Sequence, residues 1–407
     1  MTTTKPVPVL ATFANGFRFD SSDVAWARAT NWYAQTPIAH LGNFSYDAYT
    51  VLRYEEALEL MADERLSQFS RYLTYLRFFF SGPVANWWKG LMLNENGPTH
   101  ARMRRLTQKA IVPADVEALR PVMRRIANDL IDAFERDGTC EFVAAFGLPY
   151  PLAVWNEWLG IPIEQRPAFA QSIATLGQMF VPQPGSHAAI GRALATASKI
   201  AAETIAARRR APGNDLISRL IAVNLDGDRL DDDELSLTVV GLPFADSSRY
   251  QLPLGFAAFV DHPQQFARLA QQPELARAAV DEVLRWAPAI SAVSRIAWRA
   301  FDYRDLHVPW GTMLTIGIGA ANRDRNVFGD APFDIEAPRA KPPLTLGHGP
   351  HACLGYQVAH VEMEEAFSVL AARLREPKPN GAPLWITLLD LCGAQSLPVR
   401  FERRDAP

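Results

Sequence analysis

Apolar residues recur every three or four positions through most of this chain, and this spacing predicts helices. One long helix is expected over about 232–261, and another should begin at Pro98 with Thr99 as its cap. Further helices are predicted over 55–61, 116–138, 141–159, 164–179 and 187–210. The pattern therefore predicts a mainly α fold.

Alternating apolar and polar residues predict a small β region beside these helices. The stretch 42–52 is rich in β-forming residues and predicts a hairpin. A second hairpin is expected within 295–320 around the turn at 308–311, and a terminal hairpin over 391–399. The expected fold class is mainly α with a small β region.

The long helix over 232–261 contains features that conflict with a regular helix. Pro243 and Pro253 each lack a backbone donor and clash with the preceding turn, so the helix should kink or open at these positions. Asp246 and Ser247 lie in the middle of the same apolar segment, where a polar pair is costly unless it is used or satisfied.

Composition narrows the class of protein. The 407 residues contain no linker, repeat or low-complexity run, so a single domain over 1–407 is expected, with 1–34 as an N-terminal segment. The net charge of −3 does not favour nucleic acid as a partner. Three scattered cysteines indicate a reducing compartment. No apolar run is long enough to span a membrane, so a cytoplasmic protein without a membrane partner is expected.

The loop 344–355 carries the strongest chemical signal. Gly347 and Gly349 precede Cys353, Gly355 follows it, and a periodic segment then begins. Amide groups and the positive end of a helix stabilise a thiolate at such a position, and a thiolate is a strong axial ligand for haem iron. The simpler alternative is a buried free cysteine in a glycine-rich turn.

The full pattern Gly347-x-Gly349-x-His351-x-Cys353-x-Gly355 resembles the cysteine-ligand loop of the cytochrome P450 family. The resemblance extends from about residue 35 to 402 and favours the soluble bacterial type. It implies haem b held by the thiolate of Cys353, with Gly347, His351 and Gly355 as part of the cofactor-binding loop. Leu346 stands where the family prefers phenylalanine.

Other positions match the family's haem contacts and its structural ion-pair network. His100 and Arg104 are four residues apart and resemble the pair that binds one haem propionate, and Arg295 resembles the arginine that binds the other. Pro343 stands where the family often has a propionate-binding histidine. A structural network that braces the haem loop is expected from Glu282, Arg285 and Arg339.

The distal helix departs from the family pattern. Where the family has Ala-Gly-x-Asp/Glu-Thr, this chain reads Pro243-Phe244-Ala245-Asp246-Ser247. Asp246 and Ser247 are the expected catalytic residues, a proton relay and a hydrogen-bond donor. Phe244 replaces a small residue that makes room for oxygen. A shift that pairs Ala245 and Asp246 with Ala-Gly is possible with a gap.

Aromatic residues gather in 70–90, where they form either core or the lid of an apolar pocket. In the resembled fold this region lies over the distal side of the haem, which favours the lid. The expected substrate-pocket residues are Phe78, Phe79, Trp87, Trp88, Phe180, Phe244, Ala289, Val293 and Cys392. This lining predicts a compact hydrophobic substrate.

The resemblance implies monooxygenation with electrons from NAD(P)H through a ferredoxin- or flavodoxin-type partner. Arg102, Arg105 and Lys109 share a helix face, which is either a solvated surface or a docking patch for that acidic partner. The alternative function is a haem protein of the same fold with an atypical oxygen pocket, which uses peroxide, performs another oxidative reaction or senses a haem ligand.

Overall fold

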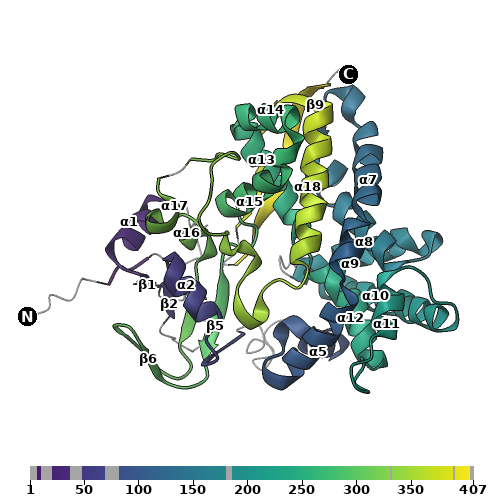
Figure 1. Cartoon of the computed structure of the whole chain (residues 1–407), viewed down its shortest axis with the longest axis horizontal. Coiled ribbons are helices and arrows are strands. Elements are labelled where there is room, and N and C mark those ends of the chain that lie inside the picture. Colours follow the sequence, from purple (N-terminus) through teal and green to yellow (C-terminus); the bar gives the residue numbers. More distant parts are fainter. Residues whose placement is uncertain are drawn as a thin grey trace, which may run out of the picture. The chain divides into compact units, whose positions relative to one another are not determined.

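The computed structural model describes residues 7–10, 21–36, 48–68, 82–179, 186–330, 332–387 and 390–403. The chain forms two compact units (Figure 1). Unit 1 comprises 1–72, 253–353 and 383–395, and unit 2 comprises 73–252, 354–382 and 396–407. Each unit combines stretches that are distant in the sequence, and we describe each by itself.

Unit 1 is built around a five-stranded sheet of order β1-β2-β8-β5-β3. Strands β2 and β8 are parallel, and the other neighbours are antiparallel. The strands are β1 (Tyr33–Gln35), β2 (Ala48–Val51), β3 (Leu66–Gln68), β5 (Val293–Ala297) and β8 (Met313–Ile316). Val51, Leu314 and Ile316 of this sheet are buried in one apolar cluster with Tyr54 and Leu60 of the following helix.

Short helices and two small strand pairs complete unit 1. The helices are α1 (Ser22–Thr30), α2 (Tyr54–Met61), α14 (Pro263–Gln271), α15 (Ala276–Trp286), α16 (Ile318–Ala321) and α17 (Arg325–Phe328). The strand pairs are β6 (Phe301–Tyr303) with β7 (Leu306–Val308), and β10 (Leu384–Thr387) with β11 (Cys392–Ser396). The prediction of a helix after the first strands is therefore confirmed by α2.

Unit 2 is mainly helical. Its helices are α4 (Gly82–Gly90), α5 (Gly97–Ala110), α6 (Pro113–Glu117), α7 (Arg120–Asp132), α8 (Pro149–Leu159), α9 (Arg166–Leu176), α10 (Ser186–Arg210), α11 (Leu216–Ala222), α12 (Asp232–Ala245) and α18 (Tyr356–Arg373). Helices α18 and α7 run side by side (Figure 1). Strands β4 (Thr139–Glu141), β12 (Pro398–Arg403) and β9 (Leu374–Pro379) form a sheet with β12 in the centre.

The long helix predicted over 232–261 is interrupted, but not at its prolines. Helix α12 ends at Ala245, Asp246 is extended with φ −66° and ψ 115°, and α13 (Ser248–Asp261) follows. Pro243 and Pro253 both lie inside helices. The prediction of the break's position was wrong, because Asp246 accepts a hydrogen bond from the backbone of Ser248 and so starts a new helix.

Three smaller predictions also need correction. Asn96, and not Thr99, occupies the N-cap position of α5. Within 295–320 the hairpin turn lies at Arg304, which has φ 53° and joins β6 to β7, and not at 308–311. Strands β5 and β8, on either side of this hairpin, pair with each other. The predicted terminal hairpin is divided, because β11 pairs with β10 whereas β12 pairs with β4 and β9.

The described residues include no helix that is both long and apolar enough to cross a membrane. The first predicted hairpin is described only in part, since 42–47 lie outside the described residues. Its flanking strands β1 and β2 are antiparallel neighbours.

Candidate active site

The cysteine loop of unit 1 is held in a tight backbone conformation. Gly347 and Gly349 both have φ 73°, a region that favours glycine. The amide of Cys353 donates to Leu346 O at 2.7 Å, and Gly347 N donates to Leu344 O at 2.8 Å. Helix α18 begins just after this loop, at Tyr356. The loop thus presents a half-buried Cys353 at a fixed place in the chain.

Gly349 also allows a close approach between the loop and α2. A Cβ atom at this position would lie 2.8 Å from Ala62 Cα and 3.3 Å from Met61 O. Such distances are too short for a real Cβ contact, so the loop can lie against the end of α2 only with glycine at position 349.

Two residues that the sequence analysis missed anchor the loop to α15. Thr345 Oγ1 donates to Leu284 O at 2.6 Å, and Asn322 Nδ2 donates to Thr345 Oγ1 at 2.9 Å. Asn322 Oδ1 accepts from Leu344 N at 2.8 Å. Both side chains are buried. Thr345 lies between two leucines, and this was the available signal, whereas Asn322 begins a polar stretch.

Glu282, Arg285 and Arg339 form one buried cluster in unit 1. Arg285 Nη2 and Nε donate to the two carboxylate oxygens of Glu282 at 2.7 and 2.8 Å. Arg339 Nη2 and Nε reach the same carboxylate at 2.9 and 3.2 Å. Arg285 also donates to the carbonyls of Pro332 and Asn322. The cluster therefore ties α15 to the segment that precedes the cysteine loop.

Arg295 is a buried cation that has no carboxylate partner among the described residues. Its Nη1 donates to Gln68 Oε1 at 2.7 Å and to Ser294 O at 3.2 Å. Burial lowers the pKa of the Arg295 guanidinium to about 10. A buried guanidinium that lacks a counter-charge fits a ligand that brings a carboxylate, as a haem propionate does.

His100 and Arg104 belong to α5 of unit 2 and lie one turn apart. His100 is buried, and burial together with the charge of Arg104 lowers its pKa. The second stripe of α5 is not a free basic surface. Arg102 donates to Asp228 Oδ1 at 2.8 Å and to Glu234 Oε1, and Arg105 donates to Asp228 Oδ2 at 2.9 Å.

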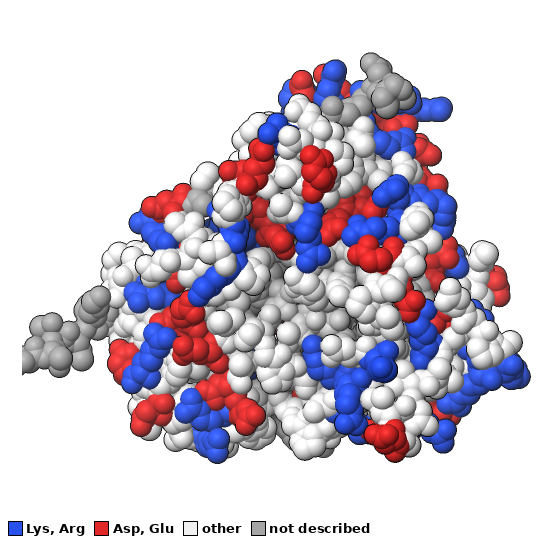
Figure 2. Space-filling view, in the orientation of Figure 1, with Lys and Arg blue, Asp and Glu red and all other residues white. Residues whose placement is uncertain are grey.

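Lys109 completes the stripe and is exposed. The acidic partners come from Asp228 and Glu234 outside α5, and Figure 2 shows acidic atoms close to a group of basic atoms in the region where Figure 1 draws α5. These ion pairs reduce the positive potential that a docking surface for an acidic partner would need.

The break between α12 and α13 places Asp246 in a polar cluster of unit 2. Trp155 Nε1 donates to Asp246 Oδ2 at 2.9 Å, and Ser248 N donates to Asp246 Oδ1 at 2.9 Å. The carbonyl of Ser247 accepts from Tyr250 N and Gln251 N and so begins α13. Both carboxylate oxygens of Asp246 therefore have donors, which keep its position fixed.

Glu362 of α18 belongs to the same cluster and was missed by the sequence analysis. Its side chain is 1% exposed, and its Oε1 has no hydrogen-bond partner in the described structure. Burial, reinforced by the charge of Asp246, raises the pKa of Glu362 well above its usual range, although a hydrogen bond with Ser248 opposes the shift. Burial therefore favours the protonated form of Glu362 beside Asp246.

Some of the residues predicted to line the substrate pocket have described contacts within their own unit. In unit 2, the buried ring of Phe244 meets Trp87 and Trp88 edge-on, with ring centroids 4.9 and 6.1 Å apart. In unit 1, Cys392 N donates to Ala289 O at 2.7 Å, and Val293 begins β5. Phe78, Phe79 and Phe180 lie outside the described residues.

Comparison with known proteins agrees with this arrangement. The Cytochrome P450 family model matches residues 261–375. Luteothin monooxygenase of Streptomyces thioluteus is 34% identical over 391 residues, which cover 95% of this chain and 94% of that protein. The 6-deoxyerythronolide B hydroxylase of Saccharopolyspora erythraea is 30% identical over 409 residues, which cover 94% of this chain and 98% of that protein. The structure of cytochrome P450 PksS of Bacillus subtilis matches with a TM-score of 0.81 and 28% identity over 92% of this chain and 95% of that one.

Proposed function

Because this chain belongs to the cytochrome P450 family and is a monooxygenase of the bacterial type, we propose that it inserts one oxygen atom of dioxygen into a small hydrophobic molecule. The loop at Cys353 is the observation that carries the proposal, since its two left-handed glycines and its hydrogen bonds suit a sulfur ligand. NAD(P)H would supply the electrons through a ferredoxin- or flavodoxin-type protein.

The residues present fit haem b. Cys353 would provide the axial thiolate within the loop that includes Gly347, His351 and Gly355. Arg295 would bind one propionate, for which its buried and unpaired charge is suited. His100 and Arg104 would bind the other propionate. Haem held in this way would supply the activation of dioxygen.

The protein's own acids and hydroxyls would supply protons. Reduction of dioxygen to water and an inserted oxygen atom consumes two protons. Asp246 would receive a proton and pass it on through the hydroxyl of Ser247, while Trp155 holds Asp246 Oδ2 in place. Glu362, whose pKa is raised by burial and by the charge of Asp246, would be the internal source of that proton.

The names of the relatives support the substrate class. They include a luteothin monooxygenase, a 6-deoxyerythronolide B hydroxylase and a nocardicin C N-oxygenase. We infer a product of secondary metabolism with a substantial apolar surface as the substrate here, in keeping with the aromatic side chains of Trp87, Trp88 and Phe244.

The absorption spectrum of the reduced protein with carbon monoxide tests the haem site. The red-shifted Soret band of a thiolate-ligated haem is expected, and Cys353→His should abolish that shift while Cys392→Ser leaves it unchanged. An unshifted band in the unaltered protein would contradict the thiolate ligand. The need for an electron partner is tested with NADPH, a ferredoxin and its reductase, compared with hydrogen peroxide alone.

A further inference from the structure

Arg249 is a buried cation with no ion pair to a carboxylate among the described residues. It belongs to the first turn of α13, and its side chain is 5% exposed. Nη2 donates to Phe244 O at 2.9 Å, but Nε and Nη1 have no hydrogen-bond partner within the described structure. Three N–H groups of a buried guanidinium are therefore unsatisfied.

This arrangement is too costly to be explained by helix structure alone. A buried charge without a partner destabilises a fold by several kcal/mol, roughly, and arginine does not escape that cost by losing its proton. The first turn of a helix also repels a positive charge. The bond to Phe244 O stabilises the end of α12, yet it uses only one of the donors.

The neighbouring acids do not balance this charge. Asp246 is occupied by Trp155 and by the backbone of Ser248. Burial raises the pKa of Glu362 and so disfavours its charged form, and the charged side chain that acts on it is Asp246. The acidic side chains of this region are therefore committed elsewhere, so the counter-charge for Arg249 must come from outside the described chain.

The surroundings of Arg249 suit a small anionic group. Tyr250 places its ring 5.1 Å from Cζ of Arg249. Gly177 lies beside the guanidinium, and a Cβ atom there would be 3.3 Å from Nη2 and 3.6 Å from the Tyr250 hydroxyl. A side chain at 177 would crowd the guanidinium, so glycine at this position lets two donor groups, a guanidinium and a phenol, lie together beside the backbone.

We propose that Arg249, with the hydroxyl of Tyr250, forms a subsite that binds a carboxylate group of the substrate. The subsite rests on the proposed oxygenase function and adds that the hydrophobic substrate carries a negative charge at one end. The aromatic side chains of Phe244, Trp87 and Trp88 would contact its apolar part. Arg249 then acts in binding and orientation.

The test compares paired ligands that differ only in charge. Straight-chain and aryl-alkyl carboxylic acids of increasing length are titrated into the holoenzyme beside their primary amides, with calorimetry and the haem spin-state shift as readouts. In the unaltered enzyme the best acid should bind about 10- to 100-fold more tightly than its amide. Arg249→Met should remove that preference while leaving the amide's affinity unchanged.

Two further variants keep the test independent of folding. Arg249→Lys preserves the charge and should retain part of the preference. Tyr250→Phe preserves the ring and the guanidinium and should weaken acid binding roughly 3- to 10-fold. Lys199→Met, which removes an exposed positive charge from α10, is the control and should leave both affinities unchanged.

Several results would overturn the subsite. These are equal affinity for every acid and its amide, an acid preference that survives in Arg249→Met, or a lower haem content in Arg249→Met with both ligands weakened alike. A normal thiolate spectrum with carbon monoxide in the same samples would show that the proposed oxygenase function stands while the carboxylate subsite fails.

Discussion

The pKa of Glu362 is raised because the side chain is buried and lies near the charge of Asp246. In the folded protein its pKa lies well above 4.5, its value in an exposed glutamate. The folded state therefore binds more protons than the unfolded state above that pH. The stabilisation that the protonated Glu362 gives the folded state is complete below pH 4.5. It is lost as the pH rises toward the folded pKa, and the free energy of unfolding falls by up to about 1.4 kcal/mol per pH unit.

Glu362→Gln tests this linkage, because glutamine has a similar shape and stays neutral. We expect both proteins to have similar thermal midpoints near pH 5, and the variant to become progressively more stable than the unaltered protein from pH 6 to 8. Circular dichroism at a series of pH values measures the difference. Parallel curves at all pH values would contradict a raised pKa for Glu362.

Gly349 offers a second test at the level of a single residue. Gly349→Ala would strain a backbone with φ 73° and press a methyl group against Ala62. Gly329→Ala is the matched control, since its φ is 66° but nothing lies within 4 Å of the added Cβ. Backbone strain costs about 1–3 kcal/mol in both, and Gly349→Ala should lose further stability and haem content.

A thermal melt and the ratio of Soret to protein absorbance measure the two effects. Equal losses in both variants would mean that the contact with α2 does not constrain the cysteine loop.

At the level of elements, the break between α12 and α13 contains two adjacent residues with different roles, Asp246 and Ser247. Asp246 supports the start of α13 through Ser248 N, whereas we propose that the hydroxyl of Ser247 transfers protons. Ser247→Ala should therefore change the thermal midpoint little, and it should increase the electrons consumed per product severalfold. NADPH oxidation measured beside product formation decides this, and unchanged coupling would remove Ser247 from the relay.

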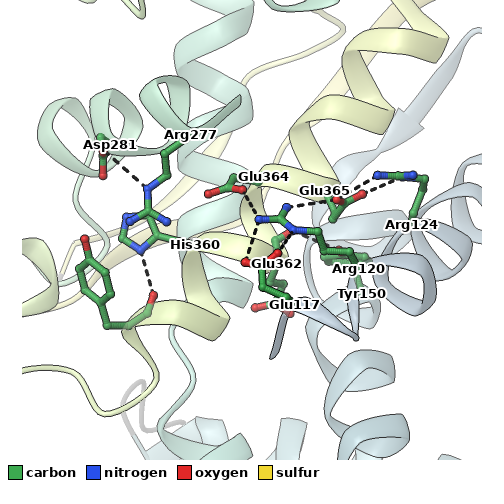
Figure 3. Close-up of polar contacts among 11 residues, drawn as sticks. Glu117, Arg120, Arg124, Tyr150, Arg277, Asp281, His360, Glu362, Glu364 and Glu365 are labelled. Carbon is green, nitrogen blue, oxygen red and sulfur yellow. Dashed lines mark hydrogen bonds and ion pairs between the residues drawn. The ribbon is translucent and has the colours of Figure 1, made fainter. Parts of the chain in front are cut away.

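Helices α7 and α18 are joined by a charged network (Figure 3). Arg120 donates to Glu117, to Glu364 Oε2 at 2.7 Å and to Glu365 Oε1 at 3.2 Å, while Arg124 donates to Glu365. The two glutamates of α18 are buried, so these bonds are weakly screened.

Arg120→Gln should destabilise the protein by about 1–3 kcal/mol, because it removes donors from buried carboxylates. Arg125→Gln is the control. Its partners Asp129 and Glu157 are more exposed, so less than about 1 kcal/mol is expected. Denaturant midpoints measure both, and equal effects would argue against a structural role for the α7–α18 network.

At the scale of the whole molecule, the sequence predicted the fold class and the family because the cysteine loop has a rigid local pattern. The grouping of Glu282 with Arg285 was also predictable, since residues three apart meet on a helix. Asn322 and Thr345 could not be found in this way. Their bonds join positions far apart in the chain, and only the tertiary fold brings them together.

The break at Asp246 was missed for a related reason. The two prolines were the stronger local signal for a break, yet each lies inside a helix. The helix ends instead at Asp246, whose side chain accepts a hydrogen bond from Ser248 N. The same limit applies to Arg249, whose lack of partners is a property of its surroundings and not of its sequence neighbours.

The interleaving of the two units has a consequence for synthesis on the ribosome. Strand β2 can pair with β8 only after about 260 further residues have been synthesised. The central strand β12 is synthesised after both of its neighbours, β4 and β9. In a nascent chain that stalls before Pro398, β4 and β9 therefore have unpaired backbone N–H and C=O groups. Such edges can form hydrogen bonds with strands of other chains. The need for chaperones should consequently fall once residues 398–403 have been synthesised and can pair with β4 and β9.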